Sequence, residues 1–343
     1  MTIQSDYTVG LTKEPAYGTF TAPTRFFEAE STLKEKVTTK QGSGMRPSQR
    51  VARASRRAIV KRESSGDITL DAMSVGLGYL LGAFFGVSTI TQIAATAVYQ
   101  QVHTLKKVDY LDSYTIQQGI PRLGSDTTDA YTYTGAQCGQ LSIDAKADDI
   151  VSMKTSWIAK ELSLAQAYAA PSYPAELDLF TFVGGSIAIG GTAFTAPTTT
   201  ALASAGAALA TVRDVSVALD NGLDKNGFNL GGGARRSRPA ALIGGKEDVV
   251  GGSFTVEYSD RDFVDAYLDQ ADMSLILKFE GPAEIAAGYL PTLQVAVPLI
   301  RLDGDLPTGN GGDVITVQHP WTGLAPASGE PVYAVYRSLD TAL

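Results

Sequence analysis

The sequence predicts a mainly β protein of the α+β kind, organised as two tandem, similar domains. Two observations carry this prediction. Short β-prone stretches bounded by turn residues recur along the 343 residues, 35 of which are glycine, and this composition favours many turns and short strands. In addition, a strand–helix–strand unit occurs once in each half of the chain, with other matching segments in the same order around it.

The clearest unit is the stretch from Gly252 to Gly281. Its first residues alternate and are β-prone, which predicts a strand over residues 253–258. A Ser-x-x-Asp pattern from Ser259 then predicts a helix start, and apolar residues at three- and four-residue spacing extend the helix to near Asp272. A second strand over residues 274–279 follows. The helix must therefore pack on a sheet.

The first half contains a similar unit. Gly66–Asp71 matches Gly252–Glu257, and the spacing predicts a helix over Met73–Phe85 with Gly86 as its C-terminal stop. A second strand follows over Asp112–Gly119.

Further matches extend the repeat. Asp149 and Trp157 have the same separation as Asp313 and Trp321, and these are the only two tryptophans. The shared order predicts an internal duplication. We expect a first domain over residues 1–183, an uncharged linker or hairpin over 184–210 rich in Gly, Ala, Thr and Ser, and a second domain over 211–343.

Composition limits the function. The net charge of −8 argues against a surface built throughout to bind nucleic acid. The single cysteine, Cys138, excludes an intrachain disulfide, fits assembly in a reducing cytosol and is expected to be a buried thiol. The N-terminus shows no signal peptide pattern. Ala72–Val102 carries no charge, but its glycines and polar second half predict a buried helix and a strand, not a membrane span.

The strongest charge feature is the segment from Gly42 to Glu63. It contains seven basic residues and no acid before Glu63: Arg46, Arg50, Arg53, Arg56, Arg57, Lys61 and Arg62. A second Gly-rich loop carries Arg235, Arg236 and Arg238. Three interpretations of the first segment stay open: a solvated or subunit-facing loop, a nucleic-acid contact and a targeting signal. A basic loop in an acidic, self-associating protein is expected to meet an acidic neighbour, so both loops are predicted to lie between subunits or rings.

The sequence contains no pattern for catalysis, a cofactor or a metal. His103 and His319 are the only histidines and do not form a metal-ligand pattern with Cys138. The carboxylates of Asp148-Asp149 and of Asp260 and Asp262 fit a turn and a helix start. We therefore expect no enzyme, no cofactor and no metal site.

The pattern resembles the tail tube, or major tail, proteins of bacteriophages with long non-contractile tails. The residues that carry this resemblance are Glu14–Thr19, Pro23–Phe27, Glu30-Ser31, Gly66–Leu70 leading into Leu77–Gly82, Val212–Asn221 and the Gly251–Gly281 unit. The resemblance implies β-sandwich or β-barrel domains, each with a packed helix, in a structural virion protein whose rings stack into a tube for genome delivery. It also implies a tape measure protein, a tail terminator and baseplate or tail-tip proteins as partners, a virion tail location, synthesis in the host cytoplasm, and DNA that passes through without sequence-specific binding.

Two domain copies per chain predict a ring of three chains with pseudo-sixfold symmetry, with a homohexamer as the other possibility. The arginine-dense segment 46–62 does not match the family pattern. It leaves an alternative function open, a β-rich nucleic-acid-binding or packaging accessory protein that uses this segment.

Overall fold

The computed structural model describes residues 7–174, 178–206, 211–244, 249–304, 306–309 and 314–342. Within these ranges strands dominate, and the two α-helices are short. Eighteen strands belong to one connected, antiparallel sheet system, and a two-stranded hairpin stands beside it. The mainly β prediction with few helices is confirmed.

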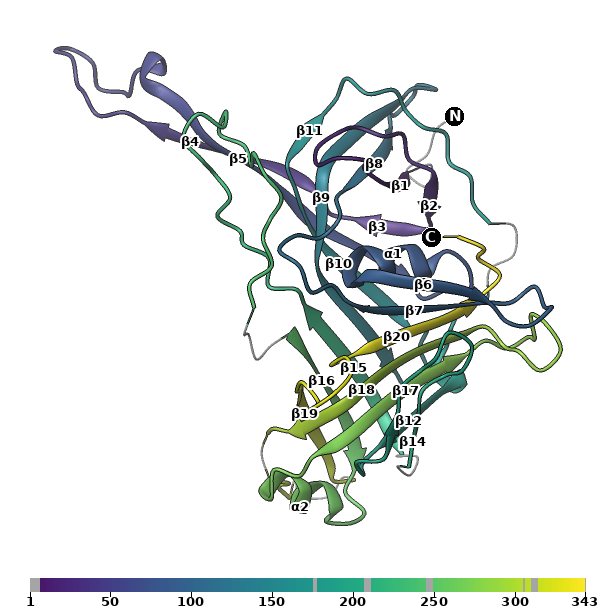
Figure 1. Cartoon of the computed structure of the whole chain (residues 1–343). Coiled ribbons are helices and arrows are strands. Elements are labelled where there is room, and N and C mark those ends of the chain that lie inside the picture. Colours follow the sequence, from purple (N-terminus) through teal and green to yellow (C-terminus); the bar gives the residue numbers. More distant parts are fainter. Residues whose placement is uncertain are drawn as a thin grey trace.

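The first half of the chain, as we use the term below, contains β1 to β11 (Figure 1). The elements are β1 (Thr8–Lys13), β2 (Arg25–Phe27), β3 (Ala29–Ser31), β4 (Lys34–Gln41), β5 (Arg57–Asp71), α1 (Leu77–Phe85), β6 (Gly86–Gln92), β7 (Tyr99–Leu105), β8 (Tyr114–Pro121), β9 (Thr128–Lys146), β10 (Ser152–Ala159) and β11 (Glu161–Ser163).

The second half contains β12 to β20. The elements are β12 (Gly185–Ile189), β13 (Phe194–Thr195), β14 (Ser204–Ala205), β15 (Val212–Asp220), β16 (Val250–Glu257), α2 (Asp262–Leu268), β17 (Met273–Glu280), β18 (Thr292–Leu302), β19 (Thr316–Gly323) and β20 (Tyr333–Ser338). Short 3₁₀ turns lie at Ala54–Arg56 and Phe182–Gly184.

Six strand pairings recur in the two halves in the same chain order. In the first half they are β1–β8, β4–β5, β5–β10, β8–β9, β9–β10 and β9–β11. In the second half they are β12–β17, β15–β16, β16–β19, β17–β18, β18–β19 and β18–β20. Each helix follows the second strand of its β4–β5 or β15–β16 pair, as the sequence pattern predicts.

The register of the two halves also agrees at the repeated glycine and tryptophan. Gly66 of β5 lies opposite Trp157 of β10, and Gly252 of β16 lies opposite Trp321 of β19. At Gly252 a Cβ atom would lie 2.7 Å from the Trp321 ring and would also collide with the Ser216 carbonyl oxygen. The close approach of the indole therefore requires glycine at this position.

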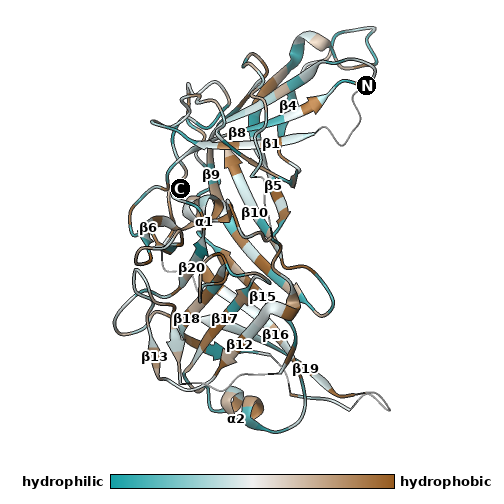
Figure 2. Ribbon diagram, turned by 90° about the vertical axis from the view of Figure 1, so that its right-hand side faces the viewer, coloured by the Kyte–Doolittle hydropathy of each residue, from teal (hydrophilic) through white to brown (hydrophobic). Residues whose placement is uncertain are grey.

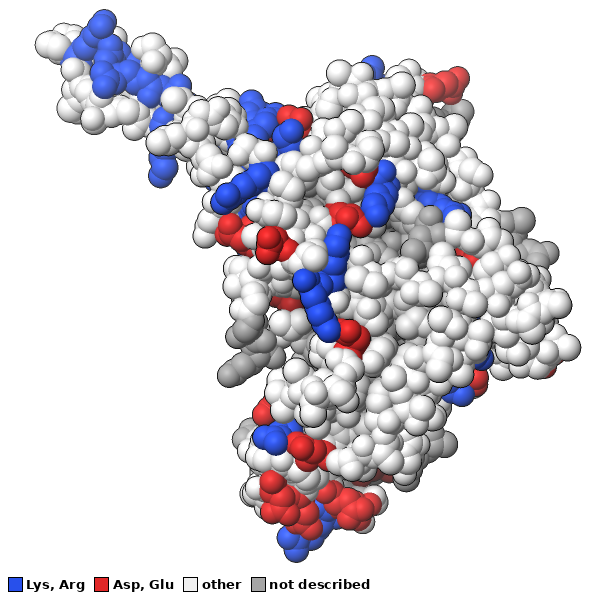
Figure 3. All heavy atoms as spheres, viewed as in Figure 1, with Lys and Arg blue, Asp and Glu red and all other residues white. Residues whose placement is uncertain are grey.

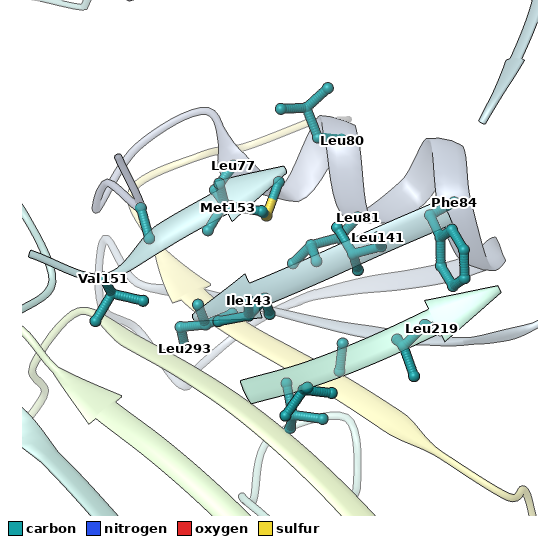
Figure 4. Packing of buried hydrophobic residues seen from close by; sticks show 14 of the residues in the cluster. Leu77, Leu80, Leu81, Phe84, Leu141, Ile143, Val151, Met153, Leu219 and Leu293 are labelled. Carbon is teal, nitrogen blue, oxygen red and sulfur yellow. The ribbon is translucent and has the colours of Figure 1, made fainter. Parts of the chain in front are cut away.

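Two strand pairs join the halves. β9 pairs with β15 from Gln140 opposite Asp220 to Lys146 opposite Asp214. β7 pairs with β20 from Tyr99 opposite Ser338 to Thr104 opposite Tyr333. One hydrophobic cluster extends through both halves. Figure 4 shows its centre, where Leu81 and Phe84 of α1 face Leu141 of β9. The large sheet alternates in hydropathy along β10 and β15, as Figure 2 shows.

Four local predictions need correction. The helix predicted over Met73–Phe85 begins only at Leu77, because Met73 forms a β-bridge with Leu179 and Gly76 adopts a left-handed conformation (φ 91°). The Gly86 stop is confirmed, with φ 76°.

The second helix also differs from its prediction. It ends at Leu268 and not near Asp272, and Ser259 does not cap it. Instead, the Asp260 carboxylate accepts a hydrogen bond from the Asp262 N–H at 3.1 Å.

The other two corrections concern segments between repeated strands. The basic segment 42–63, predicted as a loop, is the outer part of a long β4–β5 hairpin. The segment 184–210, expected as a linker or hairpin, contains the hairpin β13–β14 within its described part, but it also contains β12, which pairs with β17 in the large sheet.

Candidate assembly surfaces

The β4–β5 hairpin extends away from the rest of the molecule (Figure 1). Its ladder runs from Lys34 opposite Ser65 to Gln41 opposite Arg57. Beyond the ladder, the Gly42 N–H donates to the Arg56 carbonyl oxygen at 2.8 Å, and the Gln41 amide donates to the Arg53 carbonyl oxygen at 3.1 Å. These bonds keep residues 42–56, the hairpin tip, in a defined turn.

The hairpin tip is basic and exposed. Figure 3 shows its blue side chains at the far end of the molecule. Arg46, Arg50 and Arg56 are exposed, Arg53 is half-buried, and the adjacent Arg57 donates to the Thr39 hydroxyl at 2.9 Å. None of these five arginines forms an ion pair with another residue in the described part of the chain. The tip therefore presents unneutralised positive charge.

The remaining predicted basic residues lie at the hairpin base, where the structure brings both Arg-containing loops together. Arg62 and Arg235 both contact the Oε1 atom of Glu35 at 3.3 Å. Lys61 lies 2.9 Å from Glu63. Arg236 is 3% exposed, whereas Arg238 is exposed. The sequence predicted two basic loops with one role, whereas the structure separates an exposed tip from a base at which Lys61, Arg62 and Arg235 are ion-paired.

A second surface is the outward face of six neighbouring strands, β5, β10, β9, β15, β16 and β19. Residues directly opposite one another across these strands point to the same side, and one side packs into the core. The other side is small, hydroxylic and acidic, and we call it the acidic face. Its charged residues are Asp67, Asp71, Asp144, Asp214, Asp220, Glu257, Lys146, Lys154 and Arg213, which pairs with Glu257.

The acidic face has ordered side chains. Lys154 lies 2.8 Å from Asp67, and the Ser156 hydroxyl donates to Asp67 at 2.7 Å. Burial opposes ionisation of Asp67, but these two hydrogen bonds outweigh it and lower the pKa of Asp67. Thr255 donates to Asp214 at 2.7 Å. The Asp67 carboxylate is therefore held in its charged form at neutral pH.

A third surface surrounds α2, at the end of the molecule opposite the hairpin tip (Figures 1 and 3). Five exposed aspartates lie there: Asp260, Asp262, Asp265, Asp269 and Asp272. Arg261 and Arg301 pair with Asp265 and Asp272. The two ends of the molecule therefore carry opposite charge.

The outer edge of β4 is open, and β18 is shorter than β9, its counterpart in the first half. β4 pairs with β5 on one side, and no other described strand pairs with its outer edge. β18 ends at Leu302, which lies opposite Trp321. In the first half the corresponding residue is Cys138 of β9, which lies opposite Trp157. β9 continues for eight further residues to Lys146, and most of these residues form the joint with β15. An unpaired strand edge is a template for another chain.

The groups considered for chemistry are buried or structural. Cys138 is fully buried, and burial raises the pKa of its thiol. Burial lowers the pKa of His103 to about 3. Among the described residues, no cluster of three or more metal-ligating side chains occurs, and no helix is long and apolar enough to cross a membrane.

The residues that form the acidic face and the strand that forms the open edge, β4, were not identified from the sequence. The face is visible there only as alternation of apolar residues with Ser, Thr and Asp, which requires the pairing of six strands before it becomes a surface. The open edge of β4 has no sequence signal, because an edge is defined by the strand partner that it lacks.

The family model described as phage tail tube protein matches residues 4–323 of this chain. No curated protein sequence matches this chain. Because the family model covers most of the sequence, the chain belongs to the phage tail tube protein family. It is therefore a structural protein of the bacteriophage tail, a class that has no catalytic role.

Proposed function

We propose that the chain assembles into rings that stack into the tail tube, the conduit through which the genome enters the host. The observation that carries this proposal is the joint between β9 and β15. It connects two halves that share the same strand pairings. The counterpart of β15, which is β4, has an unpaired outer edge, and the counterpart of β9, which is β18, ends before the residues that would form the matching joint.

The ring contact follows from this correspondence. β4 occupies in the first half the place that β15 occupies in the second, and β18 corresponds to β9. The outer edge of β4 in one chain would therefore pair with the residues after Leu302 in the next chain, which would extend β18. Lys34 and Lys36 of β4 would then lie near Asp303, so the charges of the two edges are complementary.

This contact is heterologous, with different surfaces on its two sides, and such contacts generate closed rings or helices. Two similar units per chain, over residues 1–183 and 211–343, support a ring of three chains with six similar positions. The shared pairings and the matching Gly66–Trp157 and Gly252–Trp321 registers support this division into two units.

The acidic face is the surface we assign to the inside of the tube. It crosses the β9–β15 joint without interruption, so it would continue around a ring built from the same joint. Six carboxylates, two lysines and Arg213, which pairs with Glu257, leave it with net negative charge. Like charge repels DNA phosphates, which keeps the DNA from adhering to the wall.

The hairpin tip is the surface we assign to contacts between rings. Its arginines lie at the end of the molecule opposite the aspartates around α2 (Figure 3). In a stack of rings with one polarity, the basic end of each chain faces the acidic end of a chain in the next ring. Complementary charge of this kind steers association and fixes orientation. Tail completion by a tape measure protein, a terminator and tail-tip proteins follows from the family alone.

Electron microscopy of the purified protein over a concentration series tests the proposal, with hydrogen exchange of residues 303–309 measured on the same samples. We expect rings of three chains and hollow tubes, with slower exchange in the assembled form. Changing Lys34 and Lys36 to Glu is expected to abolish rings, whereas the matched Lys225→Glu change is not. Six chains in a ring would contradict the trimer. A chain that stays monomeric, with unchanged exchange, would contradict the assembly itself.

The unpaired arginines of the tip also support the second candidate, a nucleic-acid-binding accessory protein. Retention of the unassembled chain on DNA at increasing salt separates the two functions. The accessory function predicts retention that falls steeply with salt, by about one unit of log-log slope for each phosphate contact. We expect no retention at physiological salt.

A further inference from the structure

The connection between β4 and β5 and the connection between β15 and β16 occupy corresponding positions in the two halves, but they run in different directions. The turn between β4 and β5 is carried outward on a long ladder that ends at Gln41 opposite Arg57. The ladder between β15 and β16 ends at Leu219 opposite Val250. The connection that follows β15, described over residues 221–244, does not project. Figure 1 shows it in green, running up beside β5.

We infer that the segment 223–242 is a brace that fixes the direction of the β4–β5 hairpin. It is the second-half counterpart of the hairpin tip, folded back onto the first half. Each chain would then present one projecting hairpin, β4–β5, although its internal repeat contains two equivalent positions for such a hairpin, one in each half.

The ends of the brace are anchored in the first half. Leu223 and Ala240 are buried in a small apolar cluster with Leu111. The Leu242 N–H donates to the Asp109 carbonyl oxygen at 2.9 Å, and the Ala240 N–H donates to the Gln137 side chain at 2.6 Å. These contacts bury both ends of the segment, so its middle is held in place.

The middle of the brace contacts β5 where its pairing with β10 has ended. That pairing stops at Ser64 opposite Ala159. Two residues nearer the tip, the Arg62 N–H donates to the Ala234 carbonyl oxygen at 2.7 Å. The brace thus continues the hydrogen bonding along this edge of β5 and stiffens the hairpin where it leaves the sheet.

Side chains reinforce the contact on both strands of the hairpin. Arg235 of the brace and Arg62 of β5 share the carboxylate of Glu35, whose side chain is 8% exposed. Lys61 lies 4.3 Å from the centre of the Phe228 ring, and the Arg236 guanidinium lies 5.7 Å from it. Cation–π contacts and a shared, shielded carboxylate are stronger than exposed ion pairs. Glu35, Phe228 and Arg235 are therefore positioning residues for the hairpin.

Distance measurement between two spin labels on the unassembled chain tests the brace. One label is placed on the tip by Ser55→Cys and the other on β6 by Thr89→Cys, both exposed positions. Cys138 is fully buried and does not react. In the otherwise unchanged chain we expect one narrow distance distribution. Phe228→Ala and Glu35→Gln are each expected to broaden it by about twofold, because the hairpin base loses its restraint.

Glu257→Gln is the matched control, since it breaks the Arg213–Glu257 ion pair in the second half, and it should leave the distribution narrow. Circular dichroism identifies a variant that has not folded, and in that case the part-exposed Phe228 variant decides the result. Narrow distributions in both folded variants would overturn the brace. The labels report on single chains, so a chain that never forms tubes would refute the proposed function and leave this test intact.

Discussion

The two helices occupy corresponding positions in the two halves, yet their surroundings differ. Seven of the residues of α1 are buried, and it contacts β7, β9 and β20. In α2 only Val264 is buried, and the helix lies at one end of the molecule against β18. The helix sequences agree with these surroundings. The buried helix, Leu77–Phe85, has no charged residue, whereas the exposed helix, Asp262–Leu268, has two aspartates.

The difference arises from an insertion that only the first half has. The hairpin β6–β7 follows α1 and pairs with β20 from the second half. These strands enclose α1, so this helix became part of the joint between the halves. The second half has no such insertion after α2, and its helix kept one face in solvent. The two corresponding helices therefore differ in burial, and we expect them to contribute differently to the stability of the protein.

The largest expected effect is a truncation in α1. Phe84 is fully buried and lies edge-to-face with Phe85 at 5.2 Å between ring centres. Phe84→Ala is expected to lower the free energy of unfolding by about 3–5 kcal/mol, whereas Val264→Ala in α2 should cost roughly 1 kcal/mol. Urea denaturation measures both. Equal losses would refute the contrast between the helices.

A second test concerns acid stability and the buried histidine of the insertion. His103 is fully buried, and its Nδ1 atom lies 2.7 Å from the Ser88 hydroxyl. The folded pKa of about 3 lies below the unfolded value of 6.5. The contribution of His103 to the free energy of unfolding is therefore fully present above pH 6.5. It falls as the pH decreases toward 3, with a limiting slope of about 1.4 kcal/mol per pH unit.

The variant His103→Gln should flatten the stability of the protein in this pH window. Burial also lowers the pKa of His319 in the second half, so His319→Gln serves as the comparison. Denaturation midpoints between pH 4 and 7 distinguish them. An unchanged pH profile in the His103 variant would show that another group causes the acid sensitivity.

The two corresponding tryptophans, Trp157 and Trp321, allow a comparison of single hydrogen bonds. The Trp157 Nε1–H donates to the Thr155 hydroxyl at 2.8 Å, whereas the buried Nε1–H of Trp321 has no partner among the described residues. Trp→Phe should therefore cost about 1 kcal/mol more at position 157 than at position 321, because only the first change removes a hydrogen bond. Thermal and urea denaturation of the two variants supply the measurement. A larger loss at position 321 would contradict it.

The smallest expected effect lies on the exposed side of α2. Arg261 pairs with Asp265 at 2.9 Å, and both side chains are more than half exposed. Such a pair contributes about 0.3–0.5 kcal/mol at low salt. Arg261→Ala should lower stability by no more than this, and the difference should vanish in 1 M salt. A salt-independent loss would indicate packing instead of charge.

The repeated unit was predictable because its signals are local. Glycine, strand pattern, helix spacing and tryptophan recur at matching positions, and the structure places Gly66 and Gly252 opposite the two indoles. The family was predictable for the same reason. The family model confirms it, while ring formation, the trimer and the limits of the two domains stay predictions.

The parts that were not predictable depend on distant partners. Met73 fits the helical spacing, but it pairs with Leu179 from the far end of the first half. β12 lies in an uncharged Gly- and Ser-rich segment and is a strand because β17 provides its partner. Glu35 and Arg235 lie two hundred residues apart in sequence, and no local pattern indicates their ion pair.

The pairing of β20 with β7 has a consequence for how the protein is made. β20 completes the surroundings of α1, and Tyr336 and Asp340 hydrogen-bond to Met73 and Gly76 just before that helix. While the ribosome is still translating the second half, α1 lacks this cover and the first half has not reached its final packing. Contacts so distant in sequence form slowly. Completion of the chain therefore determines when α1 and the joint between the two halves reach their final packing.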